Sequence, residues 1–129
     1  MSVQITAVYA SVLAILYIVL SYRVAQRRMR LQVGLGTGEN RELERAIRIH
    51  GNFAEYVPFA LLLLALYESG GAPGWAVHVA GVALLFARML HAVGLTQSSG
   101  RSTGRFTGIL STWLVILALA VANLVSVLA

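Results

Sequence analysis

Four long apolar segments dominate this chain, separated by short stretches rich in glycine, arginine or serine. Each is long enough to cross a bilayer as a helix, which takes about 20 residues. A backbone surrounded by lipid must satisfy its own hydrogen bonds, and a helix does so within one segment. We therefore predict one all-α integral membrane domain over residues 1–129, a bundle of four transmembrane helices at about residues 3–24, 41–69, 74–95 and 105–128.

The composition supports a membrane protein surrounded by lipids. Hydrophobic residues make up 58% of the chain and charged residues only 12%. The net charge of +5 does not indicate nucleic acid as a partner, because the basic residues are not interleaved with aromatics on a soluble domain. Cysteine is absent, which excludes disulfides, thiolate metal sites and a protein thiol nucleophile. The three histidines lack helical ligand spacing beside a carboxylate, so we expect no metal site.

The arginines predict the orientation. Nine of the ten lie in or beside the two stretches that follow the first and third segments. The positive-inside rule places both charged loops in the cytoplasm and both termini outside, which for a bacterial protein means the inner membrane. The first segment has no charged side chain before Arg23 and no small-residue cleavage site after it, so we expect it to be a retained span.

One polar stripe enters the second segment. Its members are spaced by four, three, four and three residues and so share one helix face: Arg41, Arg45, Arg48, Asn52 and Glu55. An ionised carboxylate at bilayer depth is costly unless it is paired, which makes this stripe a candidate functional site. Its order of cations, amide and carboxylate suits an elongated zwitterionic ligand. The alternative is an inter-helix polar network, whose contacts contribute about 0.6 kcal/mol each.

The third segment carries Arg88 and His91 on one face. In an antiparallel hairpin that turns near residue 72, Arg88 and Glu55 lie at similar depth, since each is about 16 or 17 residues from the turn. We predict that they pair, within one subunit or across to a neighbour. Such a pair can be purely structural.

Arg105 opens the fourth predicted helix, where the helix dipole and free amides already favour an anion. An arginine there can stabilise a thiolate or a phosphate. It can equally be an ordinary flanking residue under the positive-inside rule.

The second segment resembles the second-helix signature of the MAPEG superfamily, the membrane-associated proteins in eicosanoid and glutathione metabolism. The similarity lies in the pattern Glu44-Arg45-Ala46-x-Arg48-x-His50-x-Asn52-x-x-Glu55-x-x-Pro58-Phe59. Four spans, a basic first loop and an Arg-x-x-His pair in the third span extend it over nearly the whole chain. The sequence around GNFAEYVP is most similar to that of the small bacterial members of the superfamily.

This resemblance implies a homotrimer of four-helix bundles that binds glutathione between subunits near the cytoplasmic side. It implies glutathione contacts at Arg48, Asn52, Glu55, Tyr56, Arg88 and His91, and at one of Arg27, Arg28 or Arg30 in the first loop. The thiol-activating arginine of the family matches Arg105, with Arg101 as the alternative. The implied function is a membrane-bound glutathione-dependent transferase or peroxidase acting on hydrophobic electrophiles. In that mechanism Arg105 lowers the thiol pKa from about 8.5.

Two departures favour an alternative. Gly51 stands where the prostaglandin synthase branch has another arginine, and Leu95 stands where it has a tyrosine one turn after the histidine. Both are compatible with a non-catalytic lipid-binding or scaffold member of the same fold. A small efflux transporter ranks last, because such proteins carry a glutamate in the first span and this chain has no acid there.

Overall fold

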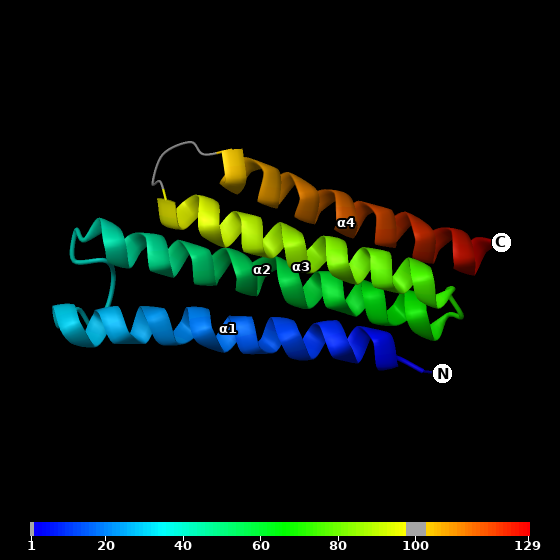
Figure 1. The fold of residues 1–129 in the computed structure, drawn as a ribbon, viewed down its shortest axis with the longest axis horizontal. Coiled ribbons are helices and arrows are strands. Elements are labelled where there is room, and N and C mark those ends of the chain that lie inside the picture. Colours follow the sequence, from blue (N-terminus) through cyan, green and yellow to red (C-terminus); the bar gives the residue numbers. More distant parts are fainter. Residues whose placement is uncertain (1, 98–102) are drawn as a thin grey trace.

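Four helices run side by side along the molecule (Figure 1). The computed structural model describes residues 2–97 and 103–129, and in this part of the chain each helix is long and apolar enough to cross a membrane. The helices are α1 (Gln4–Leu31), α2 (Arg41–Ser69), α3 (Gly74–Gln97) and α4 (Thr103–Leu128). They alternate in direction, so both termini lie at the end of the bundle where α2 turns into α3. The predicted fold class, an all-α bundle of four membrane-spanning helices, is confirmed.

The helices extend beyond the apolar segments in three places. α1 continues to Leu31, well past the expected end near residue 24, because hydropathy marks only the lipid-buried part of a helix. Arginine, glutamine and methionine are good helix formers and carry the helix on. The helix ends at Leu31, and the residue that follows it, Gln32, has a left-handed φ of 55°. α3 and α4 each reach two residues past their expected limits, to Gln97 and from Thr103.

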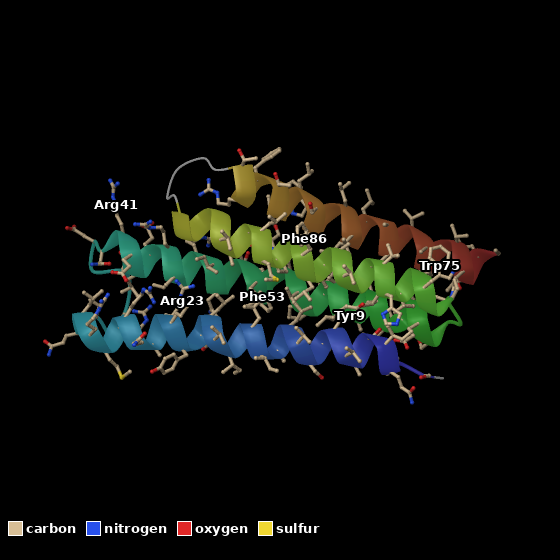
Figure 2. All side chains as sticks on the ribbon, viewed as in Figure 1. Tyr9, Arg23, Arg41, Phe53, Trp75 and Phe86 are labelled. Carbon is tan, nitrogen blue, oxygen red and sulfur yellow. The ribbon has the colours of Figure 1, made fainter. Side chains whose placement is uncertain are left out.

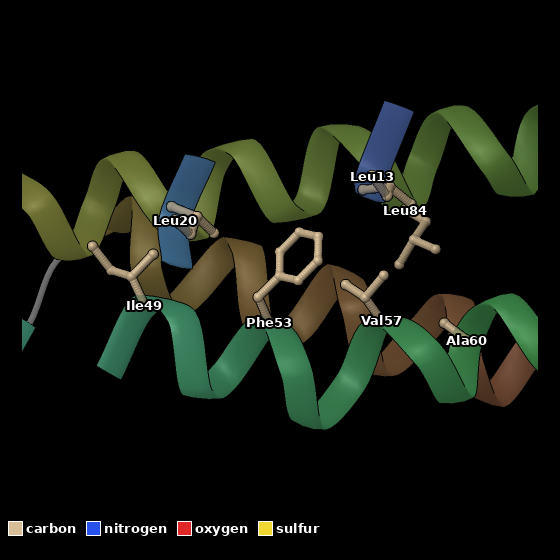
Figure 3. Close-up of a cluster of buried hydrophobic side chains, with 7 residues drawn as sticks. All are labelled: Leu13, Leu20, Ile49, Phe53, Val57, Ala60 and Leu84. Atoms are coloured by element: carbon tan, nitrogen blue, oxygen red, sulfur yellow. The ribbon is translucent and has the colours of Figure 1, made fainter. Parts of the chain in front are cut away.

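α2 organises the bundle. Asn40 caps its N-terminus by accepting a hydrogen bond from the backbone amide of Leu43 at 2.9 Å. Its apolar residues recur at helical spacing and are buried against α1 and α3. Figure 3 shows the central part of this core, formed by Leu13 and Leu20 of α1, Ile49, Phe53, Val57 and Ala60 of α2, and Leu84 of α3.

A glutamate from α2 caps the N-terminus of α1. The residue before that helix, Val3, makes no side-chain cap hydrogen bond. Instead the two carboxylate oxygens of Glu68 accept hydrogen bonds from the backbone amides of Ile5 at 2.9 Å and Thr6 at 2.7 Å. The anion meets the positive end of the helix dipole and satisfies two amides that have no partner within the helix. Glu68 thus anchors α1 to the end of α2.

Glycines allow the backbones of α3 and α4 to approach closely, and this helix pair has the most extensive contact in the described part of the chain. A Cβ added at Gly94 would lie 2.6 Å from the carbonyl carbon of Gly104, and one at Gly108 would lie 2.7 Å from the Cα of His91. Gly104 and Gly108 form a small-xxx-small pattern, which lets helix backbones approach in a membrane. The close approach fixes the first turn of α4 against the last turns of α3.

We expect Glu68→Gln to loosen the N-terminus of α1, because the carboxylate that accepts from both amides is lost. Replacing a good cap costs about 0.5–2 kcal/mol. Hydrogen exchange at the Ile5 and Thr6 amides should accelerate, and an SDS titration followed by circular dichroism should show earlier unfolding. Glu39→Gln, the same change in the first loop, is the matched control. Equal protection of the two amides in both variants would contradict the capping role.

We expect Gly94→Ala to destabilise the bundle by about 1–3 kcal/mol, because the new methyl group forces α4 away from α3. The same SDS titration measures the change. Gly51→Ala is the control, since nothing lies within 4 Å of a Cβ at that position. Alanine there should gain up to about 1 kcal/mol from helix propensity. Similar unfolding curves for the two variants would show that the close approach is not required.

Candidate functional site

A polar cavity of about 340 Å³ opens between α2, α3 and α4. Figure 2 shows nitrogen-bearing side chains gathered at the end of the bundle where α1 turns into α2, with Arg23 and Arg41 marked among them. The volume lies within the range of about 300–1,000 Å³ that is usual for small-molecule sites. The lining residues are Glu44, Arg45, Arg48 and Asn52 of α2, His91 of α3, and Arg105 and Ile109 of α4.

The charge of this cavity selects for anions. It has three guanidinium groups against one carboxylate. Arg48 is exposed on the surface of a single chain, while Arg45 and Arg105 are half-buried. Guanidinium groups bind carboxylates and phosphates with two parallel hydrogen bonds, so the lining favours a ligand with such groups. Arg105 lies in the first turn of α4, where the helix dipole adds to the attraction.

Arg88 lies behind the cavity, with an exposed fraction of only 1%. Its guanidinium donates to Asn52 Oδ1 at 2.6 Å and to Thr112 Oγ1 at 3.3 Å, and it lies 3.4 Å from His91 Nδ1. The ring of Phe53 stacks near the same group, with its centroid 5.8 Å from Cζ. Among the described residues Nε has no hydrogen-bond partner. Arg88 therefore joins α2, α3 and α4 and does not line the cavity.

Within one chain the predicted pair of Arg88 and Glu55 does not form. Arg88 contacts Asn52 instead, one helical turn before Glu55. Within the described ranges, the recorded ion pairs join Glu42 to Arg27 and Arg30, and neither includes Arg88. Arg88 is almost fully covered within one chain, and a pair across to a neighbouring subunit stays a prediction. The helix-rise estimate of depth was correct to one turn, but one turn decides which side chain the guanidinium meets.

Glu55 and Tyr56, two predicted ligand contacts, line a different cavity. It has a volume of about 410 Å³ and lies between α2 and α4, with mostly apolar walls. Glu55 is exposed on the same face of α2 as Arg48. The other lining residues are Phe59, Trp113, Ile116, Leu117 and Ala120. In one chain these two predicted contacts are therefore separate from Arg48 and Asn52.

Arg27 and Arg28, which the structure places in the last turns of α1, make contacts that support the fold of a single chain. Arg27 Nε binds Glu42 Oε1 at 3.0 Å, which ties α1 to the start of α2. Arg28 donates to the backbone carbonyls of Val33 at 3.2 Å and Gly36 at 2.9 Å and so holds the glycine-rich loop. Neither side chain lines the polar cavity. The spacing of these arginines in the sequence does not indicate their partners, because a long side chain can reach several nearby acceptors.

Four of the predicted site residues do come together in the polar cavity: Arg48, Asn52, His91 and Arg105. The predicted ligand contacts did not include Glu44, Arg45 or Ile109, although Arg45 belongs to the α2 stripe that was the candidate functional site. Sequence reasoning also missed Thr112. The spacing Gly104-x-x-x-Gly108-x-x-x-Thr112 was the available signal, since it marks the face of α4 that packs on α3. Arg101 and the side chain of Leu95 lie outside the described residues.

Comparison with known proteins identifies the family of this chain. Residues 6–125 match the sequence profile of the MAPEG family. The chain is also 39% identical over 121 residues to the inner membrane protein YecN of Escherichia coli strain K12, and equally to YecN of Escherichia coli O6:H1. Each match covers 94% of this chain and 91% of the relative. The chain is a membrane protein that belongs to the MAPEG family.

Proposed function

We propose that this protein is a membrane-bound, glutathione-dependent transferase or peroxidase that acts on hydrophobic electrophiles. The observation that carries the proposal is the polar cavity, where Arg48, Asn52 and Arg105 face one space at the arginine-rich end of the bundle. Glutathione has two carboxylates, an ammonium group and a thiol, so cationic walls with one carboxylate match it. The family to which the chain belongs is named for glutathione metabolism.

In this proposal the residues of α2 hold the peptide. Arg48 and Arg45 bind carboxylates, and Asn52 binds a peptide or carboxylate oxygen. Glu55 was predicted as a glutathione contact, but in a single chain it lines the apolar cavity and not the polar one. Glu44 lines the cavity and is the carboxylate within reach there.

Arg105 stabilises the thiolate from the first turn of α4. A cation beside a thiol favours the ionised form, which is the nucleophile. Bound glutathione supplies that nucleophile, whose sulfur forms a bond to the electrophilic carbon as the leaving group departs with its electron pair. The apolar cavity beside Trp113 and Leu117 gives a hydrophobic electrophile a route along α4 from the lipid.

We further propose a homotrimer in the bacterial inner membrane, with both charged loops cytoplasmic and both termini outside. Exposed Arg48 and Glu55 lie on a helix long enough to span the membrane, where charged groups require partners. A neighbouring subunit or a ligand supplies them. A neighbour's α1 also brings Arg27 or Arg28 toward the open side of the cavity, where each is proposed to contact glutathione. The cytoplasmic orientation follows from the arginine-rich loops.

A non-catalytic lipid-binding or scaffold role is the second candidate. Gly51 and Leu95 favour it, because both lack the polar side chains that the prostaglandin synthase branch carries at these positions. The two candidates differ in what the purified protein retains. Native mass spectrometry should show trimers that gain the mass of glutathione at millimolar concentration. Trimers that retain a lipid and gain no glutathione would favour the second candidate.

We expect Arg105→Gln to reduce the rate of glutathione conjugation to chlorodinitrobenzene at neutral pH by about 100-fold, the usual cost of losing one preorganised charge-stabilising donor. Glutathione affinity from isothermal titration should change far less, because other residues hold the peptide. Arg41→Gln is the control, since Arg41 is exposed at the same end and does not line the cavity. Absence of wild-type binding at millimolar glutathione would refute the proposed function. An unchanged rate in Arg105→Gln would show that Arg105 does not stabilise the thiolate.

A further inference from the structure

Arg88 has five N–H donors and no acceptor, so every polar group that it binds must accept. We propose that Arg88 is a positioning residue that fixes Asn52 and His91 as hydrogen-bond donors toward the polar cavity. This wall then recognises the carboxylate end of a ligand and discriminates against the corresponding ester. The identity of the ligand as glutathione rests on the proposed function, whereas the orientation of the two side chains does not.

Asn52 shows the effect most directly. Its Oδ1 lies 2.6 Å from an Arg88 nitrogen, a short charge-assisted hydrogen bond. The amide oxygen is therefore occupied on the inner side, and a flipped amide would place its NH₂ group against the guanidinium donors. Asn52 is half-buried and lines the cavity. Its NH₂ group remains for a ligand, so this position binds an acceptor.

His91 is constrained in the same way. Its Nδ1 lies 3.4 Å from the same Arg88 nitrogen. Since the guanidinium only donates, Nδ1 carries a lone pair and the neutral ring holds its proton on Nε2. His91 is 4% exposed and lines the cavity, so its remaining N–H is a second donor for a ligand.

Thr112 fixes the guanidinium itself. Its Oγ1 accepts from Arg88 at 3.3 Å and donates to the carbonyl of Gly108 at 2.8 Å. The same Gly108 packs against the backbone of His91. Arg88 is thus held from α4 while it orients side chains on α2 and α3. The wall that results offers N–H groups from Asn52 and His91 beside the arginines, and its carboxylate is that of Glu44.

The first experiment reads the tautomer of His91 in the ligand-free protein. His91 becomes the only histidine in the variant His50→Gln/His78→Gln, and ¹⁵N NMR of ¹⁵N-histidine-labelled protein in detergent then distinguishes the two ring nitrogens. We expect one tautomer, protonated at Nε2. Adding Arg88→Met should give a mixture, and adding Arg88→Lys should restore the Nε2 form, because an ammonium group also only donates. A ring protonated at Nδ1 in the presence of Arg88 overturns the proposal without any Arg88 variant.

The second experiment measures the affinities for glutathione and for its diethyl ester by isothermal titration, and compares them as a ratio. The wild type should bind the acid about tenfold or more tightly, as expected for charge-assisted hydrogen bonds. Arg88→Met should reduce this ratio to about threefold or less, while Arg41→Met should leave it unchanged. An unchanged ratio in Arg88→Met overturns the proposal. If neither compound binds the wild type, the proposed function fails, and the tautomer of His91 still decides the role of Arg88.

Discussion

A buried guanidinium connects three of the four helices. Arg88 is charged, 1% exposed and located in a membrane-spanning helix, so its N–H groups must find acceptors within the protein. It finds them on α2 at Asn52 and on α4 at Thr112, with His91 of its own helix beside it. Removing such a group leaves polar partners unsatisfied, whereas keeping it fixes the relative rotation of three helices.

The close packing of α3 and α4 makes this network possible. Thr112 reaches Arg88 because Gly108 allows α4 to lie against the backbone of His91. The same approach brings Arg105 into the lining of the polar cavity, since Gly94 packs against the backbone of Gly104 and Arg105. Backbone contact between small residues thus determines where the charged side chains lie. At the other end of the bundle, Glu68 anchors α1 to α2 through the amides of Ile5 and Thr6.

The polar stripe of α2 is the part of the candidate site that the sequence predicted best. Helical spacing correctly placed Arg45, Arg48 and Asn52 on one face, because such spacing depends on one helix alone. The partner of Arg88 could not be obtained in this way. It depends on the relative shift and rotation of α2 and α3, and an error of one turn exchanged Asn52 for Glu55. The partners of Arg27 and Arg28 could not be predicted either. Their long side chains can reach backbone carbonyls as well as Glu42, and the sequence does not show which contact forms.

The number of helices, their membrane character and the polar face of α2 follow from the amino-acid sequence alone. Hydrophobic length and helical periodicity are properties of single segments, and a bilayer leaves such segments few other structures. The packing of the helices was needed to show that Arg88 is buried and that Thr112 belongs to its hydrogen-bond network. It also separated Glu55 and Tyr56 from the polar cavity within one chain. These features depend on how closely helix backbones approach, which is set by packing between glycines on different helices.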